Sequence, residues 1–367
     1  MSERTKVLIC GVLPPPYFGH SMLYEMLMRS EFPRTYDVRF LNMHFWSYET
    51  NKKVTGEKIL KLFLYLVQFC WFIVSFQPRY VLYNTSFYKM PFLKDFLFCS
   101  LGIVLGRKIV IHDHGQYVKE LYGVLPVWQR ALLCWLLEHS NASIIMGERV
   151  RPFYNGLMAQ EKLFVVPGTV EDTQNIPMEK KDFWGEVNVL YFSHLSHDKG
   201  AEVAFNAVPL ILKAKKDVRV TFAGPVENDG IALRLEALQQ AFPGRVRYLG
   251  YIDRVSERAR IFRSADIFIF PTLRDVFGLV LLHAMAEGLP VVASNEGTIP
   301  EIIPDTGYGI LFEKGSAIEL SEQVLVLVED PVRRRAMGAA NRRRFEKEYS
   351  LGAYGDKMVN VFRQLEA

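Results

Sequence analysis

The stretch that decides the fold runs from Ala265 to Ile303 and has the sequence ADIFIFPTLRDVFGLVLLHAMAEGLPVVASNEGTIPEII. It begins with a buried-strand pattern, continues through a short loop, and changes to a helical pattern after Gly278. A glycine at the start of a helix lets an anion approach the free backbone N–H groups of the first turn. We therefore expect the amides of Phe277, Gly278 and Leu279 to bind a diphosphate.

Two polar side chains flank this expected phosphate site. Asp275 lies in the loop before Gly278, and His283 lies about five residues into the helix, roughly 7 Å along its axis at about 1.5 Å per residue. These positions can reach the two ends of a bound diphosphate. Each also has a structural alternative, because Asp275 can cap the helix and His283 can pair with Glu287 on the next turn.

Strand and helix patterns alternate on both sides of this stretch, which predicts parallel βαβ units and a doubly wound α/β fold in two Rossmann-like domains. Strands are expected at 7–10, 37–41, 80–83, 108–112, 142–146, 163–166, 187–192, 218–223, 246–249, 267–270 and 291–293, followed by a mostly helical tail over 318–366. The polar segment 177–186 is the expected linker, so the domains are expected at 1–176 and 177–351. Ligand is expected in the cleft between them, at the carboxyl ends of the strands.

Composition excludes several classes of protein. Of the 367 residues, 50% are hydrophobic and 23% are charged, which is typical of folded domains rather than disordered chains. The four cysteines have no CxxC spacing, which argues against a disulfide scaffold or a zinc ribbon. No G-x-G-x-x-G motif follows the first strand and no P-loop is present, so the sequence lacks the motifs expected of a dehydrogenase or a kinase.

The N-terminal half is the more basic and the more apolar. Residues 1–172 contain 19 Lys and Arg against 14 Asp and Glu, whereas residues 173–367 contain 25 against 26. The imbalance is too small to indicate nucleic acid, but it fits an anionic partner such as a membrane surface. The apolar segment Ile59–Phe76 is interrupted by Lys61 and Gln68, so we favour a sheet-packing helix. A helix whose outer face docks on a membrane and a true span are the alternatives.

The N-terminus runs directly from MSERTKVLICG into a strand pattern, so the sequence predicts no secretory signal. We expect a cytoplasmic protein with peripheral contact at the cytoplasmic face of the membrane.

The motif around Asp275 and His283 resembles that of the family 4 glycosyltransferases, which are retaining enzymes of the GT-B fold. Their signature is E-x7-E around FGLVLLEAM and GLPVVA, followed by IPE. Asp275 and His283 occupy the positions of the two glutamates. The segment 190–200, LYFSHLSHDKG, resembles another family element, with Lys199 retained and His194 in place of the usual arginine. The match in the first half is looser, through loop 11–21 and the strand end 112–115.

The resemblance implies a GT-B fold whose last helix, about 352–367, crosses back to the first domain. It also implies transfer of a hexosyl group from a nucleotide diphosphate sugar with retention of configuration and without a metal or other cofactor. Lys199, His194 and the amides of 277–279 would stabilise the departing diphosphate. The implied site residues are catalytic Asp275 and His114, and donor-binding Lys199, His194, Phe277, Gly278, Leu279, His283 and Gly19.

The acceptor is expected in a polysaccharide, lipopolysaccharide or lipid-linked pathway. Two other classes stay open, an acceptor-independent nucleotide-sugar enzyme such as a 2-epimerase and a catalytically silent GT-B partner protein. The changes at His194 and His283 motivate the silent alternative. His112 and His114 have the His-x-His spacing of metal ligands, but the sequence offers no third ligand, so no metal site is expected.

Overall fold

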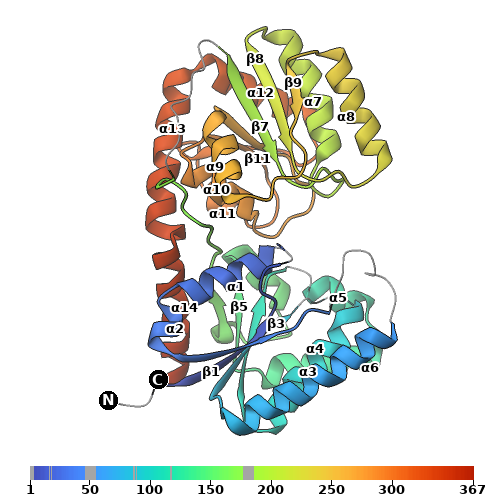
Figure 1. Ribbon diagram of the computed structural model, residues 1–367, viewed down its shortest axis with the longest axis vertical. Coiled ribbons are helices and arrows are strands. Elements are labelled where there is room, and N and C mark those ends of the chain that lie inside the picture. The colour runs from blue at the N-terminus through green and yellow to red at the C-terminus, as the bar shows by residue number, and fades with distance from the viewer. Residues whose placement is uncertain are drawn as a thin grey trace. The chain divides into compact units, whose positions relative to one another are not determined.

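The structure, a computed structural model, describes residues 4–15, 17, 19–45, 55–85, 87, 89–115, 118–176 and 186–367 (Figure 1). The chain divides into two compact units. Unit 1 comprises Met1–Gly168 together with Leu351–Ala367, and unit 2 comprises Thr169–Ser350. The predicted linker lies outside the described residues, apart from Glu186.

Unit 1 contains a parallel six-stranded sheet in the order β2-β1-β3-β4-β5-β6. The strands inside this sheet are mostly buried apolar runs, as expected of a parallel sheet that helices cover on both faces, whereas the edge strand Asp37–Asn42 is only partly buried. The strands of the sheet are β1 (Lys6–Gly11), β2 (Asp37–Asn42), β3 (Tyr80–Thr85), β4 (Lys108–Asp113), β5 (Ala142–Ile145) and β6 (Leu163–Val165). The helices are α1 (Gly19–Arg29), α2 (Phe32–Thr35), α3 (Gly56–Ser75), α4 (Lys89–Val104), α5 (Val118–Val124) and α6 (Val127–His139), with 3₁₀ turns η2 (Glu148–Tyr154) and η3 (Gln160–Lys162).

The last helix of the chain, α14 (Leu351–Glu366), packs in unit 1. The ring of Phe362 lies 5.0 Å from that of Phe32 and 5.3 Å from that of Tyr80, measured between centroids. The hydroxyl of Tyr80 donates a hydrogen bond of 2.8 Å to the carbonyl of Leu365. The expected return of the closing helix to the first domain is therefore confirmed.

Unit 2 contains a second parallel six-stranded sheet, in the order β12-β11-β10-β7-β8-β9. Its strands are β7 (Val187–Phe192), β8 (Val218–Ala223), β9 (Val246–Tyr248), β10 (Ile267–Phe270), β11 (Val291–Ser294) and β12 (Gly309–Phe312), the last of which the sequence did not predict. The helices are α7 (Ala201–Ala214), α8 (Asp229–Ala241), α9 (Val255–Ser264), α10 (Leu279–Ala286), α11 (Ile299–Ile302), α12 (Ala317–Glu329) and α13 (Pro331–Arg344), followed by a π-helical turn, η4 (Phe345–Tyr349). The two doubly wound sheets confirm the predicted fold class.

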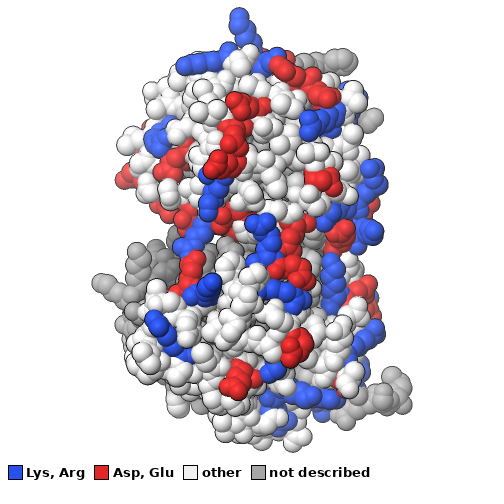
Figure 2. Space-filling model, turned by 180° about the vertical axis from the view of Figure 1, so that it is seen from behind, with Lys and Arg blue, Asp and Glu red and all other residues white. Residues whose placement is uncertain are grey.

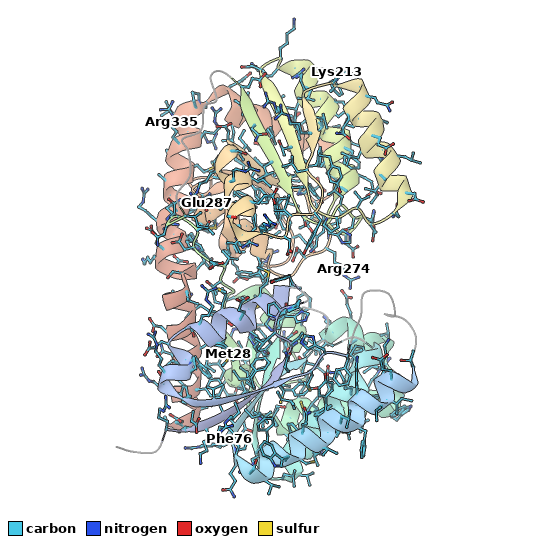
Figure 3. The ribbon with its side chains drawn as sticks, viewed as in Figure 1. Met28, Phe76, Lys213, Arg274, Glu287 and Arg335 are labelled. Carbon is cyan, nitrogen blue, oxygen red and sulfur yellow. The ribbon has the colours of Figure 1, made fainter. Side chains whose placement is uncertain are left out.

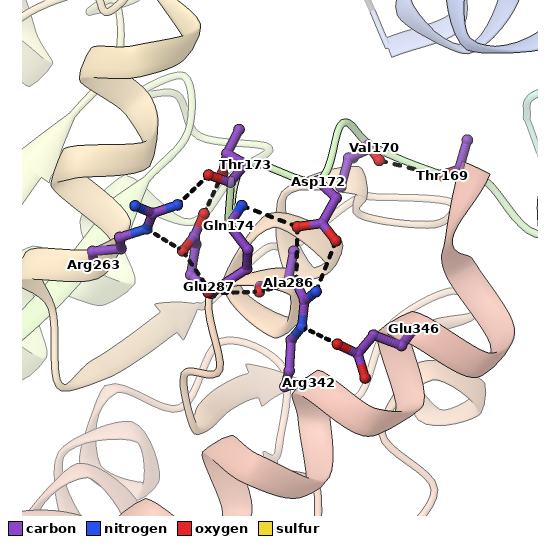
Figure 4. Close-up of polar contacts among 10 residues, drawn as sticks. All are labelled: Thr169, Val170, Asp172, Thr173, Gln174, Arg263, Ala286, Glu287, Arg342 and Glu346. Carbon is purple, nitrogen blue, oxygen red and sulfur yellow. Dashed lines mark hydrogen bonds and ion pairs between the residues drawn. The ribbon is translucent and has the colours of Figure 1, made fainter. Parts of the chain in front are cut away.

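The boundary between the units lies eight residues before the predicted one, because residues 169–176 are attached to unit 2 by side-chain contacts. The hydroxyl of Thr169 donates to the carbonyl of Tyr349 over 2.6 Å. The carboxylate of Asp172 pairs with the guanidinium of Arg342 at 2.7 Å (Figure 4). Composition alone points to the polar turn further along the chain, whereas these contacts decide where unit 2 begins.

Candidate active site

The carboxyl ends of β7 and β10 bring together two of the predicted site residues. These adjacent strands lie where the strand order of unit 2 reverses, the usual position of a ligand in an open α/β sheet. Lys199 follows β7, and Asp275 follows β10. The Nζ atom of Lys199 lies 2.5 Å from Oδ2 of Asp275, and the two side chains are 30% and 15% exposed. The sheet thus joins an ammonium and a carboxylate that are 76 residues apart in the chain.

Backbone hydrogen bonds hold the two loops that carry this pair. The carbonyl of Asp198, next to Lys199, accepts hydrogen bonds from the N–H groups of Leu273 and Arg274, at 2.8 and 2.9 Å. It also accepts one of 3.0 Å from the hydroxyl of Thr272. Because the loop after β10 is tied to the loop after β7 in this way, Asp275 is held opposite Lys199.

Gly200 permits the close approach of these loops. It has a φ of +69°, and a Cβ atom added there would lie 1.8 Å from the carbonyl oxygen of Pro271, so only glycine fits. The buried hydroxyl of Tyr191 lies 3.0 Å from the carbonyl oxygens of both His194 and Lys199. These contacts fix the backbone of the loop that carries Lys199.

Gly278 begins α10 in the left-handed region, with a φ of +71°. Its N–H donates a 3.1 Å hydrogen bond to Oδ1 of Asp275. Oδ1 of Asp275 therefore closes the turn that precedes the helix, and Oδ2 pairs with Lys199, whereas α10 itself begins at Gly278 without a side-chain cap. The first turn of the helix still offers the N–H groups of residues such as Leu279 to an anion. The side chain of Phe277 is buried against Tyr349, so only its backbone is available for that role.

His194 lies half-buried on the loop after β7. Burial lowers its pKa, and Lys199 lowers it further, against an opposing effect of Glu227. The imidazole is therefore neutral near pH 7 and can act as a hydrogen-bonding group beside the ammonium. Arg274, which is exposed, carries a further positive charge on the loop after β10 (Figure 3).

His283 lies on α10, where its ring is 5.9 Å from that of Phe262 on α9, centroid to centroid. Burial, assisted by the positive charge of Arg258, holds the pKa of His283 well below its usual value, so this imidazole is neutral. The alternative pairing with Glu287 is wrong. The carboxylate of Glu287 is 2% exposed and pairs with Nε of Arg263 at 2.7 Å, and it also accepts from the Thr173 hydroxyl (Figure 4).

The other two predicted residues, Gly19 and His114, lie in unit 1 within a group of histidines. Gly19 begins α1, next to His20, and the rings of His20 and His114 are 6.2 Å apart. The ring of His112 lies 4.0 Å from that of His114, and its Nδ1 is 3.2 Å from the hydroxyl of Tyr24. The end of β4 thus meets the start of α1 at the carboxyl edge of the sheet.

These histidines are uncharged. Burial lowers the pKa of His20 to about 4 and that of His112 to about 3, and it holds the pKa of His114 well below its usual value. Both ring nitrogens of His114 are buried without a hydrogen-bond partner in the structure. Such atoms are costly to bury, so they are available to a ligand hydroxyl. Among the described residues, no three His, Cys, Asp or Glu side chains are placed to hold a metal ion.

The sequence did not single out Asp113, the residue before His114. Its carboxylate is buried at the end of β4, where it accepts hydrogen bonds of 2.7 Å from the hydroxyl of Tyr154 and 2.8 Å from the N–H of Gly115. Burial raises the pKa of Asp113 to about 7. The sequence signal that could have identified Asp113 is an Asp two residues before a Gly at a strand end, which is the pattern of an Asx turn. The partner Tyr154 is 41 residues away and gave no signal.

Charges of both signs are mixed on the face shown in Figure 2, with no large area of one sign. Such a face is not typical of a nucleic-acid-binding surface, which gathers Lys and Arg on one patch.

Comparison with known proteins identifies the domain that contains Lys199 and Asp275. Residues 174–344 match the model of the family described as glycosyl transferases group 1. The matched segment, somewhat under half of the chain, is a group 1 glycosyltransferase domain. This domain includes β7 to β12 and α7 to α13, and therefore the whole loop pair described above.

One curated relative is the GDP-mannose-dependent monoacylated alpha-(1-6)-phosphatidylinositol monomannoside mannosyltransferase of Corynebacterium glutamicum. It is 31% identical over 209 residues, which are 54% of this chain and 52% of that protein. The chain spans about half the length of the curated relatives that it matches.

Two solved structures share the fold over nearly the entire chain. Sucrose-phosphate synthase from Thermosynechococcus elongatus has a TM-score of 0.75 at 18% identity, over 99% of each chain. HepE of Anabaena, crystallised with UDP-glucose, has a TM-score of 0.71 at 15% identity, over 98% of this chain and 99% of that one. The fold is GT-B.

Proposed function

We propose that the protein is a retaining glycosyltransferase, which moves a hexosyl group from a nucleotide diphosphate sugar to a polysaccharide, lipopolysaccharide or lipid-linked acceptor. The observation that carries this proposal is the Lys199–Asp275 pair beside the N-terminus of α10, within a glycosyltransferase domain. The names of two similar proteins also support a nucleotide-sugar donor, because one is GDP-mannose-dependent and the other was crystallised with UDP-glucose.

Donor binding would exchange the partners of this ion pair. The diphosphate would take Lys199 as its counter-charge and accept hydrogen bonds from the first-turn N–H groups of α10. Oδ2 of Asp275 would then be free to accept hydrogen bonds from hydroxyls of the sugar, while its Oδ1 still accepts from Gly278. The apo ion pair thus holds both side chains in place before the donor arrives.

The transfer breaks the bond between the anomeric carbon and the diphosphate oxygen, so negative charge develops on the diphosphate and positive charge on the sugar ring. Lys199, the helix N-terminus and a hydrogen bond from His194 would stabilise the negative charge on the diphosphate. The carboxylate of Asp275 would stabilise the positive charge on the sugar ring. The acceptor oxygen bonds to the same face of the anomeric carbon. Its proton passes to the departing diphosphate oxygen, so no side chain has to act as a base.

The remaining predicted residues would bind rather than react. His283, neutral and beside Arg258, would contact the ribose hydroxyls. In unit 1, the unpartnered nitrogens of His114 would orient the sugar ring, and Gly19 would lie near the diphosphate. No metal is required in this scheme, because the ammonium of Lys199 provides the positive charge that a divalent ion provides elsewhere.

The test is a panel of UDP-, GDP- and ADP-sugars, assayed for hydrolysis and for the increase in melting temperature that a bound ligand causes. We expect one nucleotide class to stabilise the protein and to be hydrolysed slowly, with both effects lost in Lys199→Ala. Stabilisation without turnover, with any acceptor, would show a silent partner protein. Conversion of the donor sugar to an epimer in the absence of acceptor would show an acceptor-independent nucleotide-sugar enzyme such as a 2-epimerase.

A further inference from the structure

Three helices of unit 1 carry a broad surface of exposed apolar side chains, the α3–α4–α6 face. Helix α4 packs against both α3 and α6, and Figure 1 shows the three next to one another. The apolar side chains of the face are 40% to 80% exposed. They are Ile59, Leu60, Phe63, Leu64, Val67, Trp71 and Val74 on α3, Leu93, Leu97 and Val104 on α4, and Val127 and Trp128 on α6. Monomeric soluble proteins rarely expose contiguous apolar surface on this scale.

Helix α3 is apolar on both of its sides, which is unusual for a helix at a protein surface. Its inner side is held by the unit, because the ring of Phe69 lies 5.5 Å from that of Phe98, and that of Tyr65 lies 4.9 Å from that of Phe45. The hydroxyl of Tyr65 also accepts a 3.0 Å hydrogen bond from the N–H of His44.

The outer side of α3 repeats apolar residues at positions 60, 63, 64, 67, 71 and 74, and these are exposed. By length and composition, α3 is the one helix among the described residues that could cross a membrane, and only 11% of its apolar window is buried inside the protein. Its inner contacts favour a helix that stays on the unit and lies along an apolar boundary.

Charges on the same elements favour an anionic boundary. Residues 55–139 contain nine Lys and Arg against five Asp and Glu. Lys61 pairs with Glu57 and Lys94 pairs with the buried Asp95, which leaves seven basic residues against three acidic ones, and one of those three, Asp113, is buried. Lys58 and Lys61 lie on α3 itself, and Arg130 lies on α6. Basic residues around an apolar surface are the combination that binds anionic lipid headgroups while apolar side chains enter the interface.

We propose that the α3–α4–α6 face docks on the surface of an anionic lipid bilayer, with the three helices lying in the plane of the interface. The apolar side chains enter the region between the headgroups and the acyl chains, and Trp71 and Trp128 lie at headgroup level, where indole rings are favoured. The spread of the apolar residues over three adjacent helices fits a lipid surface better than a single peptide helix, which would fill a groove. This inference does not rest on the proposed activity.

The test is co-sedimentation of the full chain with vesicles of phosphatidylcholine containing 30% phosphatidylglycerol by composition, compared with pure phosphatidylcholine. We expect binding to the anionic vesicles at low salt that weakens at high salt. The variant Phe63→Glu/Val67→Glu replaces two outer-side residues with a strong helix former, and it should reduce the partition coefficient by at least about tenfold. The matched control, Leu233→Glu/Ile318→Glu, changes two equally exposed apolar residues in unit 2 and should bind like the wild type.

A second measurement on the unchanged protein does not depend on the folding of a variant. Lipids brominated near the headgroup end of the acyl chains should quench part of the tryptophan fluorescence, because Trp71 and Trp128 would enter that region. Absence of quenching, or equal binding of the wild type and Phe63→Glu/Val67→Glu, would overturn the proposal. A wild type that ignores vesicles but forms a dimer, which the same variant dissociates, would overturn it in favour of a second copy of the chain.

Discussion

Replacing Asp275 with asparagine separates the two roles of this side chain. The amide oxygen of asparagine can still accept the 3.1 Å hydrogen bond from the Gly278 N–H, so the turn before α10 should be retained. The 2.5 Å contact with Lys199 loses its charge. Because Lys199 is 30% exposed and stays solvated, we expect the free energy of unfolding to fall by only about 1 kcal/mol.

The effect on turnover should be much larger than the effect on stability. A group that stabilises charge as it develops in the transition state contributes roughly 2.7–4 kcal/mol, so Asp275→Asn should lower kcat by about 100-fold or more. The KM for the donor should change little or fall, because Lys199 no longer has to leave a carboxylate to bind the diphosphate. Steady-state kinetics with the donor found in the nucleotide-sugar panel, together with thermal unfolding, measures both effects.

Asp198→Asn is the matched control, because its exposed side chain lies next to Lys199 while only its backbone carbonyl ties the two loops together. It should leave kcat within about threefold of the wild type. If Asp275→Asn retained a kcat similar to that of Asp198→Asn, Asp275 would not stabilise the transition state. The stabilising group would then be sought first at His114.

Four further outcomes are expected. His283→Ala should raise the donor KM and leave kcat nearly unchanged, because a contact with the ribose stabilises the ground state and the transition state equally. A loss confined to kcat would contradict this role. Glu287→Ala removes a carboxylate that is 2% exposed and leaves its partner Arg263 unpaired, so the free energy of unfolding measured in urea should fall by about 3 kcal/mol. The control Glu346→Ala removes an exposed partner of Arg342 and should lower it by less than about 1 kcal/mol. Calorimetric titration with UDP or GDP should give the same affinity with and without EDTA, and binding that disappears with the chelator would refute the metal-independent site. Buried histidines with lowered pKa values, including His112 at about 3, take up protons in this pH range only when the protein unfolds, so the melting temperature should fall as pH falls below about 6.5. The raised pKa of Asp113 has the opposite effect, but it is a single group against several histidines. A melting temperature that rose between pH 6.5 and 5 would contradict the expectation that the histidines dominate.

Much of the site could be predicted from local sequence. The Gly278 turn was expected because a helix pattern starts directly after this glycine, and the observed φ of +71° favours glycine. Lys199 and Asp275 were expected in loops after strands, where parallel sheets place their functional groups. The exchange of glutamate for His283 was visible in the motif, but its burial beside Phe262 and Arg258 was not.

Other features could not be predicted, since they depend on residues far apart in the chain. The contacts of Glu287 with Arg263 and Thr173 span 24 and 114 residues, and no local pattern marks them. For the same reason the boundary of unit 2 was placed too late, at a polar turn. Helix α3 shows a second limit of prediction from sequence. When both sides of a helix are apolar, hydrophobic periodicity does not indicate which side is covered and which is exposed.

The sequence by itself determined most of the order of strands and helices, the doubly wound class and the residues of the glycosyltransferase motif, because hydrophobic periodicity and glycine conformations act over a few residues. The tertiary structure decided the strand order around β7 and β10, the 2.5 Å pairing of Lys199 with Asp275, the histidine group around His114 and the exposure of the outer side of α3. These depend on which surfaces pack together, and packing is settled by shape and burial over the whole unit rather than by neighbours in the chain.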